Sequence, residues 1–267
     1  MLCSWGFYTH GGIDGFSRVI VYMRSSSSNK SVNVLDAFLE ACGSYGLPSR
    51  VRCDHGSENM LVGVLMNTIR STHRGSFITG RSVHNQRIER LWRDVHKEVT
   101  QKFYVRFYSM EDIGILDVEN DVHRLSLHIV FLPIINEELN KFRNAWNSHK
   151  LRTAHHKTPN QLWIEGMLSA ADEGTSTAVS EIRDTMPTLE NRLLDRLQEL
   201  GIQPDADITD QEYSNTSHDA RINSLTTEQQ QELNQLLESV TDLSDKFCVC
   251  VQKLVEFGYG GSGTEDM

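Results

Sequence analysis

The chain has 267 residues, with 26 lysines and arginines against 36 aspartates and glutamates, for a formal net charge of -10. Hydrophobic residues make up 39% and charged residues 23%, as in an ordinary soluble globular protein. No apolar run approaches the roughly 18 residues of a membrane span, and the N-terminus lacks the pattern of a secretory signal. Five cysteines without a CxxC pair argue against a disulfide scaffold or a zinc ribbon. These features predict an intracellular, soluble protein with no membrane partner.

Charge is unevenly distributed along the chain. Residues 1–165 hold 20 lysines and arginines against 16 acidic residues, whereas residues 166–267 hold 6 against 20. Such a shift within one chain indicates two segments with different partners. The front segment suits a polyanion, while the acidic rear segment would repel one and is a candidate surface for a protein partner.

Two strand patterns open the chain, and a helix pattern follows. Residues 5–9 alternate in character and residues 19–23 are β-branched and apolar, so they predict a hairpin that turns near Asp14. Apolar residues at three-to-four spacing over 32–42 predict a helix that Gly43 ends.

A second strand–helix pair and a long helical region complete the front segment. Residues 50–54 predict a short strand, and the apolar spacing over 61–69 predicts a helix. Residues 71–85 show little periodicity and predict a loop. An apolar stripe over 88–99 predicts the next helix, and a mostly helical stretch continues to about residue 167. Strands interleaved with helices of this length predict an α/β layer fold.

The rear segment has a different character. Residues 169–180 are small and polar and predict a linker, and residues 204–219 are acidic with little to bury, so we expect them to be disordered. Leucines and valines at helical spacing predict one or two helices, one of them within 225–257. The chain is thus expected to consist of a domain, residues 1–167, and an acidic segment, residues 168–267, that contacts this domain sparsely.

Two carboxylates are the strongest candidates for chemistry. Asp54 ends a predicted strand, where open α/β sheets place their functional groups, and Glu89 lies on a predicted helix. Carboxylate oxygens suit Mg²⁺, which keeps several waters and takes further ligands from substrate phosphates. Taken singly, a strand-end aspartate is often only a turn cap and a helical glutamate usually faces solvent. The basic residues near Glu89 suit a phosphate backbone; they are Arg87, Arg90, Arg93 and Lys97.

Three sequence motifs occur in order: GIDGFSR at 12–18, GLPSRVRCDHGSEN at 46–59 and RSVHNQRIERLWRDV at 81–95. Together they resemble the integrase core domain of retroviruses and retrotransposons, which belongs to the DDE polynucleotidyl transferases with an RNase H-like fold. The family spaces its last two acids similarly to Asp54 and Glu89. Downstream, the segments 146–152 and 158–163 resemble the helical tail of eukaryotic integrase-like proteins, so that the resemblance covers about residues 4–167.

The resemblance implies an RNase H-like mixed sheet with flanking helices, followed by a helical, partly disordered acidic extension. It implies DNA integration in the nucleus, by metal-dependent strand transfer or nicking, in a protein derived from a transposable element that can form homo-oligomers. By position, Asp54 and Glu89 would bind Mg²⁺ or Mn²⁺. Asn85, one helical turn before Glu89, would contact DNA together with the basic residues. In this family two metal ions bridge three carboxylates.

The first acid of the family triad has no clear counterpart. Asp14 would complete a triple with Asp54 and Glu89, but the family's D-x-x-S-R aspartate lies on the second strand, after the catalytic one. Residues 1–12 contain no acidic residue. We therefore expect a chain that lacks the first, central strand of the sheet, through a clipped gene model or as a remnant, and that is weakly active or inactive.

Two further hypotheses stay open. The basic front and the missing strand favour a domesticated nucleic-acid-binding or protein-interaction module with no chemistry. A stand-alone RNase H-like nuclease acting on RNA hybrids is the third possibility. His149, His155 and His156 lack a partner acid or cysteine and are expected to be solvated loop residues. Cys248 and Cys250 have no second cysteine pair for zinc, and we expect them in a helix core or a partner surface.

Overall fold

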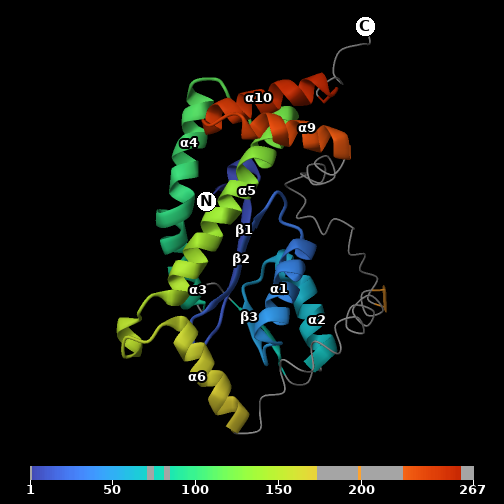
Figure 1. The fold of residues 1–267 in the computed structure, drawn as a ribbon. Coiled ribbons are helices and arrows are strands. Elements are labelled where there is room, and N and C mark those ends of the chain that lie inside the picture. Colours follow the sequence, from blue (N-terminus) through green and yellow to red (C-terminus); the bar gives the residue numbers. More distant parts are fainter. Residues whose placement is uncertain (1, 71–74, 81–84, 173–197, 200–224, 260–267) are drawn as a thin grey trace.

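The computed structural model describes residues 2–70, 75–80, 85–172, 198–199 and 225–259. This part is mixed α/β: helices predominate, and the strands form two separate two-stranded sheets (Figure 1). The α/β class predicted from the sequence is confirmed. The single mixed sheet is not formed by these residues, since no described strand joins the two pairs. None of the helices in the described part is long and apolar enough to cross a membrane.

The first sheet is an antiparallel hairpin. β1 (Tyr8–Ile13) pairs with β2 (Ile20–Ser26), with a register shift between Gly12 and Ile13, and the chain turns at Asp14 as predicted. The first strand begins later than predicted, because Leu2–Trp5 forms a short 3-10 helix. Gly6, at a φ of 74°, lets the chain turn from this helix toward the strand.

Helix α5 (Asp121–Ser148) closes the outer edge of β2. Its Asn136 side chain accepts a hydrogen bond from Ser25 N at 2.7 Å and donates one to Ser25 O at 3.0 Å. Asn147 makes the same pair of bonds with Ile20, at 2.8 and 3.1 Å. An open strand edge leaves backbone groups unpaired, so these asparagines satisfy groups that another strand would otherwise take. The hairpin is thereby fixed to α5 at both ends of β2.

The second sheet pairs β3 (Val51–Cys53) with β4 (Phe77–Thr79) in parallel. β4 lies in the stretch that was predicted to be a loop. A strand this short carries no local periodicity, and its backbone bonds depend on β3, which is distant in sequence. The helices beside it are α1 (Ser31–Tyr45) and α2 (Met60–Arg70), and α2 follows a 3-10 turn (Ser57–Asn59).

The predicted end of α1 at Gly43 is wrong. Gly43 stays within the helix, which ends at Tyr45. Gly46 follows with a φ of 86°, and its N–H donates to Cys42 O at 2.8 Å. Both glycines suit a helix end by composition, but only Gly46 adopts the backbone conformation that favours glycine.

The hairpin separates two hydrophobic cores. The large core includes Met23 of β2 and large side chains that are fully buried, among them Trp5, Phe107 and Phe131. The small core is built by α1 and α2, and Tyr22 packs against it. Successive strand residues point to opposite faces of a sheet, which is why Tyr22 and Met23 contact different cores.

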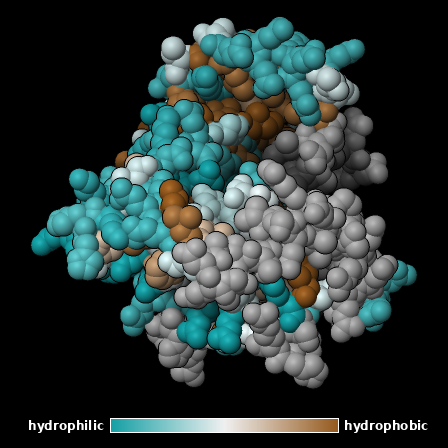
Figure 2. All heavy atoms as spheres, turned by 60° about the horizontal axis from the view of Figure 1, so that its bottom comes forward, coloured by the Kyte–Doolittle hydropathy of each residue, from teal (hydrophilic) through white to brown (hydrophobic). Residues whose placement is uncertain are grey.

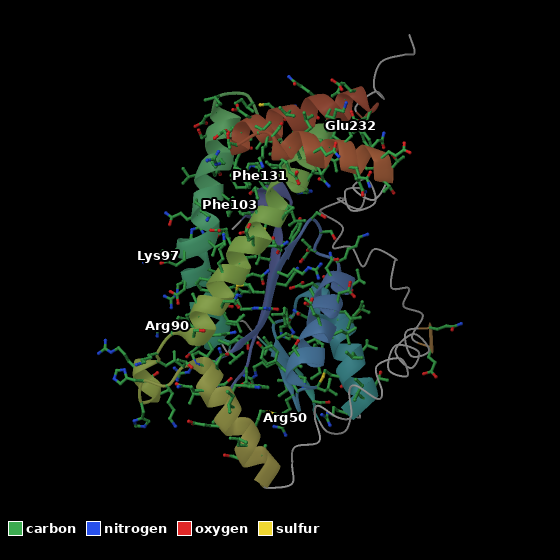
Figure 3. The ribbon with its side chains drawn as sticks, viewed as in Figure 1. Arg50, Arg90, Lys97, Phe103, Phe131 and Glu232 are labelled. Carbon is green, nitrogen blue, oxygen red and sulfur yellow. The ribbon has the colours of Figure 1, made fainter. Side chains whose placement is uncertain are left out.

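The large core is covered by a nearly continuous helical segment and by α5. α3 (Gln86–Val95) passes through a π-helical turn (His96–Thr100) into α4 (Gln101–Asp112), which lies beside α5 (Figure 1). Between α4 and α5, the rings of Phe103 and Phe131 meet edge to face with centroids 6.4 Å apart (Figure 3).

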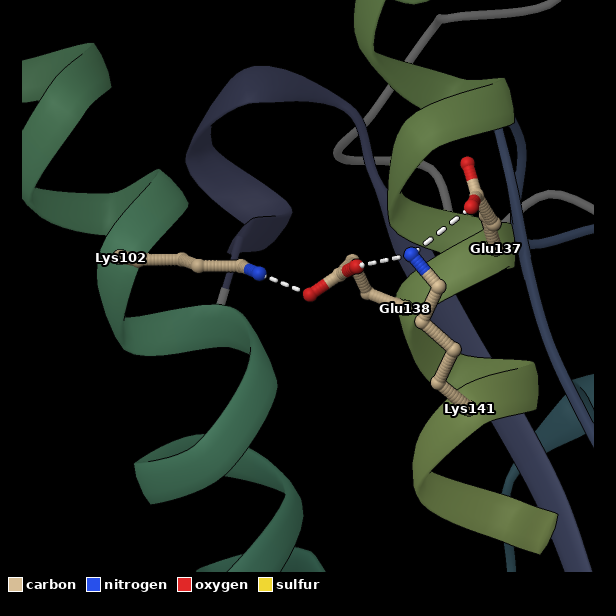
Figure 4. Close-up of polar contacts among 4 residues, drawn as sticks. All are labelled: Lys102, Glu137, Glu138 and Lys141. Atoms are coloured by element: carbon tan, nitrogen blue, oxygen red, sulfur yellow. Dashed lines mark hydrogen bonds and ion pairs between the residues drawn. The ribbon is translucent and has the colours of Figure 1, made fainter.

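Ion pairs join the same two helices at the surface. Lys102 of α4 pairs with Glu138 of α5, and Lys141 pairs with Glu138 at 3.0 Å and with Glu137 at 2.7 Å (Figure 4). These hydrogen bonds from Lys102 and Lys141 lower the pKa of Glu138. The contact between α4 and α5 therefore has an aromatic interior and a charged rim.

The last front helix is α6 (Pro159–Asp172). Its Trp163 contacts Tyr45 at the end of α1 with ring centroids 5.3 Å apart. The expected linker, residues 169–180, begins inside this helix, and most of it lies outside the described residues, as does the segment 204–219.

Two rear helices pack on the large core. α9 (Thr227–Glu238) starts with a capping box at Thr226, and α10 (Leu243–Glu256) starts at Asp242, whose side chain accepts two backbone hydrogen bonds. The predicted helix content of residues 225–257 is confirmed. The predicted sparse contact is wrong for these residues, because α10 packs against α5 and α9 packs against α10. Together they contribute Leu233, Leu237, Phe247, Cys250 and Leu254 to the large core.

Candidate metal and nucleic-acid site

Asp54 directly follows β3, at the carboxyl end of the strand. It is exposed, and its Oδ1 accepts a hydrogen bond from Asn59 Nδ2 at 3.2 Å. The same amide group donates to Glu58 Oε1 at 3.5 Å. Parallel pairing brings the end of β4 to the same edge, where Gly80 N donates to Cys53 O at 3.2 Å. The segment after β3 therefore holds two carboxylates beside one amide.

The thiol of Cys53 lies beside these carboxylates, and the phenol of Tyr22 lies near that thiol. Burial raises the pKa of Cys53 to about 11, and the charges of Asp54 and Glu58 contribute to this increase. Burial also raises the pKa of Tyr22 far above its usual value, with smaller contributions from Cys42 and Cys53. The thiolate is the form that binds metal ions, and burial disfavours this form at Cys53. Oxygen atoms are the available donors here.

Glu89 lies in the first turn of α3. Its backbone N–H donates to Asn85 O at 3.1 Å, so Asn85 stands one turn before it, as predicted. Leu91 and Val95 of the same helix are buried in the large core and anchor the helix there. Glu89 itself is exposed, and its side chain has no hydrogen bond or ion pair within the described residues. A carboxylate is stabilised near a helix N-terminus by the helix dipole.

The carboxylate oxygens of Asp54 and Glu89 are of the type that binds a divalent cation, but they do not form a complete coordination shell. Both are exposed carboxylates without an ion-pair partner among the residues described, and hard oxygen ligands are what Mg²⁺ takes. No hydrogen bond or ion pair joins them. In the described ranges, no group of three or more histidine, cysteine, aspartate or glutamate residues is arranged to hold a metal ion. These residues therefore supply oxygen donors of a suitable type, while the described residues form no complete cation site.

The basic residues of α3 are available to an anionic partner. Arg87, Arg90 and Arg93 are exposed and form no ion pair within the described part of the chain. Lys97, in the π-helical turn, is also exposed but pairs with Glu98 at 3.4 Å. Figure 3 shows Arg90 and Lys97 on the same side of the molecule. Of the predicted DNA contacts, the three arginines therefore carry charge that no described protein group compensates.

The side chain of Asp14 is engaged within the hairpin turn. Its Oδ2 accepts hydrogen bonds from Phe16 N at 3.0 Å, Ser17 N at 2.6 Å and Ser17 Oγ at 2.7 Å. The side chain is thus turned into its own hairpin loop, which is a common function of aspartate in turns.

Two other predicted features behave as expected. His149, His155 and His156 are exposed loop residues. Cys250 is buried in the large core, where burial raises its pKa to about 12, and Cys248 packs beside that core.

Two features of the structure were not predicted from the sequence. Glu58 belongs to the second motif but was given no function, although its spacing four residues after Asp54 and the adjacent Asn59 bring it into the same hydrogen-bonded group. No hydrogen-bond partners were predicted for Trp146 and Asn147. Their side chains bond to the backbone of the hairpin at Arg18 and Ile20. Nothing in the local sequence indicates partners so distant along the chain.

Comparison with known proteins agrees with the motifs. A family model described as the integrase core domain matches residues 1–178, which include Asp54, Glu89 and the basic residues of α3. No curated protein and no solved structure matches the chain. The matched domain indicates a function related to DNA integration. Since the match extends over well more than half of the sequence, the chain belongs to the integrase core domain family.

Proposed function

We propose that this protein is a DNA-binding integrase core that holds a divalent cation weakly through Asp54 and Glu89. The observation that carries the proposal concerns two exposed carboxylates, one at a strand end and one at the start of the helix that bears Arg87, Arg90 and Arg93. None of these side chains has an ion-pair partner among the described residues. The RNase H-like arrangement belongs to the same proposal. A bound Mg²⁺ or Mn²⁺ would polarise a phosphate and activate water.

Different residues of the chain contact the DNA and bind the cation in this proposal. Arg87, Arg90 and Arg93 contact the phosphate backbone and, with Asn85, position the DNA over α3. Asp54 and Glu89 supply the oxygen ligands. Asp14 is occupied by the hairpin turn, so we expect the third acid of a two-metal site to be missing and strand transfer to be absent or very slow. A nuclear location and a transposable-element origin accompany this proposal.

The test combines Mn²⁺ titration with DNA assays on the full chain. We expect weak Mn²⁺ binding that Asp54→Asn and Glu89→Gln each reduce severalfold, and DNA binding that persists in both variants. Glu119→Gln is the matched control, because Glu119 is an exposed carboxylate at another place in the fold. Robust strand transfer that Asp14→Asn abolishes would instead show that Asp14 is the first acid. Mn²⁺ binding that neither Asp54→Asn nor Glu89→Gln alters would remove the metal site from the proposal.

A second candidate function is a nucleic-acid-binding or protein-interaction module without chemistry. The engagement of Asp14 in its turn favours it, because the family reaction needs three carboxylates. DNA binding with no cleavage in Mg²⁺ or Mn²⁺, and no effect of either ion on affinity, would support this alternative over the enzyme.

A further inference from the structure

A second concentration of positive charge lies away from α3. The segment 149–157, here called the basic loop, joins α5 to α6, and its sequence HKLRTAHHK holds three lysines or arginines, three histidines and no acidic residue. In Figure 1 it forms the yellow-green projection between these helices, and in Figure 2 the corresponding edge of the molecule is hydrophilic. No sequence motif for DNA contact assigned this segment a function.

The basic loop has a fixed backbone. Leu151 is buried, its N–H donates to Lys157 O at 2.9 Å, and its carbonyl accepts from Ala154 N at 3.1 Å and His156 N at 3.0 Å. Lys157 also pairs with Glu165 of α6 at 2.7 Å. A loop held in one conformation loses less entropy when it binds a partner. The side chains that point away from these backbone hydrogen bonds are therefore held in position before a ligand binds.

The hairpin joins the basic loop to the region of α3. Arg18, in the β1–β2 turn, donates from Nη1 to Thr153 Oγ1 at 2.7 Å, and its carbonyl accepts from Trp146 Nε1 at 3.0 Å. Gly11 of the same hairpin lies close to the Trp92 ring of α3, because a Cβ atom added at Gly11 would be only 3.1 Å from that ring. The cations of α3 and those of the basic loop therefore lie on elements that contact the same hairpin.

Strained backbone conformations occur in the basic loop and at the hairpin residue that bonds to it. Among the described residues other than glycine, a positive φ occurs at Arg18 (65°), His155 (53°) and His156 (61°), and nowhere else. Two of these residues lie in the basic loop and the third bonds to it. Left-handed conformations are unfavourable for residues with a side chain and tend to gather at functional sites.

The cations considered at the basic loop and the adjacent hairpin turn are Arg18, Lys150 and Arg152. Lys150 and Arg152 are exposed, and none of the three forms an ion pair in the described part of the chain. By contrast, other cations are neutralised, as Lys102 of α4 and Lys141 of α5 are. We infer that the basic loop, with Arg18, is a second phosphate-binding site that takes the backbone of duplex nucleic acid. The inference rests on the proposed function for the choice of polyanion, and it implies binding without sequence preference.

The experiment measures binding of the full chain to a fluorescent random-sequence DNA duplex over a range of salt concentrations. The test variant is Lys150→Gln/Arg152→Gln, and the matched control is Lys141→Gln/Lys246→Gln, which removes the same charge from α5 and α10. Removing one cation that binds a phosphate lowers the slope of log affinity against log salt by about 1. We expect the slope for the test variant to fall by about 2 and its affinity at moderate salt to fall about tenfold or more, and the control to change little.

The other outcomes separate the two proposals. If Arg87→Gln/Arg90→Gln/Arg93→Gln loses binding while the basic-loop variant matches its control, the second site is wrong and the proposed function stands. If the unaltered chain does not bind DNA at low salt, both are overturned. Binding of the basic loop to vesicles containing an anionic phospholipid, with no effect of the double substitution on DNA affinity, would assign the loop to a membrane surface instead. Circular dichroism of each variant establishes that it is folded.

Discussion

The two cores differ in size and in the kind of side chain that fills them. The large core is rich in aromatic rings: Phe107, which is fully buried, contacts Trp5, Phe7, Phe103 and Phe131. The small core is mainly aliphatic, built from α1 and α2. The large core also recruits helices from distant parts of the sequence, including α9 and α10. The greater part of the stabilisation from apolar burial is therefore expected on the side of α4 and α5.

The candidate carboxylates are divided between these halves. Asp54 follows β3, beside the small core, whereas Glu89 is carried by a helix that buries Leu91 in the large core. The separation of the two acids thus depends on how the halves are joined. Tyr22 makes one such connection, because its ring lies against Gly12 of β1 and its phenol is close enough to Cys53 for that thiol to influence the pKa of the phenol.

The largest effect is expected in the aromatic core. Phe107→Ala should lower the free energy of unfolding by about 3–5 kcal/mol, since it removes a ring that touches four others and leaves a cavity. Met66→Ala, in the small core, should cost about 2–5 kcal/mol. Chemical denaturation followed by circular dichroism and by tryptophan fluorescence measures both.

The comparison of these two variants tests whether the cores are one cooperative unit. If the hairpin and Tyr22 couple them, each substitution shifts a single transition seen by both probes. A separate early transition in Met66→Ala, with most of the tryptophan fluorescence unchanged, would show that the halves unfold independently, because Trp5, Trp92 and Trp146 lie at the large core. The relation between Asp54 and Glu89 would then not be fixed by the fold.

The next effect depends on pH and concerns the hairpin. His10 of β1 has its Nε2 buried without a hydrogen-bond partner in the described structure, and burial lowers its pKa from 6.5 to about 4. Above pH 6.5 the ring is neutral in both states and has no effect. As the pH falls from 6.5 toward 4, the unfolded chain binds a proton that the folded chain excludes, so the unfolding free energy should fall by up to about 3 kcal/mol.

Comparison with His10→Gln isolates this contribution, because glutamine does not titrate. The difference in unfolding free energy between the two proteins should change over this pH interval. His155→Gln, at an exposed loop residue, is the control and should retain the pH dependence of the unaltered chain. A difference that stays constant across the interval would contradict the effect of burial on His10.

A smaller effect distinguishes the turn aspartate from the candidate metal ligands. Asp14→Ala removes one acceptor of three hydrogen bonds and should cost about 1–3 kcal/mol. Asp14→Asn keeps an acceptor oxygen and should cost less. Neither change should alter Mn²⁺ affinity, whereas Asp54→Asn should lower that affinity with little loss of stability, because Asp54 is exposed. Thermal melts and Mn²⁺ titrations on the same samples measure both quantities, and a loss of Mn²⁺ binding in Asp14→Asn would contradict the assignment.

The sequence predicted well the elements whose signal is local. The hairpin turn at Asp14, the strand before Asp54 and the helix that carries Glu89 all follow from short-range alternation or helical spacing. The strand β4 and the contact of α10 with α5 were not predicted, because both depend on partners that lie far away in sequence. Apolar spacing in residues 225–257 indicated a helix with a buried face but did not identify the surface that covers it.

The same distinction holds for the candidate site. Asp54, Glu89 and the arginines follow from motifs, and the structure has Asp54 directly after β3 and the other residues on α3. Glu58 was missed because its relation to Asp54 passes through the Asn59 amide. The charge of the basic loop is visible in the sequence, but its link to the hairpin is not, because the hydrogen bond from Arg18 to Thr153 joins residues more than a hundred positions apart.

The smallest expected effect compares the rim of the α4–α5 contact with its interior. Glu138→Gln removes the charge that pairs with Lys102 and Lys141, but these side chains are partly or largely exposed, so the cost should be no more than about 1 kcal/mol. Because the pKa of Glu138 is lowered in the folded state, its contribution is present above the ordinary carboxyl pKa and is lost as the pH falls through the lowered value. Added salt should shrink the contribution further. A thermal-melt series at neutral and acidic pH, with Phe107→Ala as the reference for the interior, measures the contrast. A loss for Glu138→Gln as large as that for Phe107→Ala would mean that charge, and not aromatic packing, holds α4 against α5.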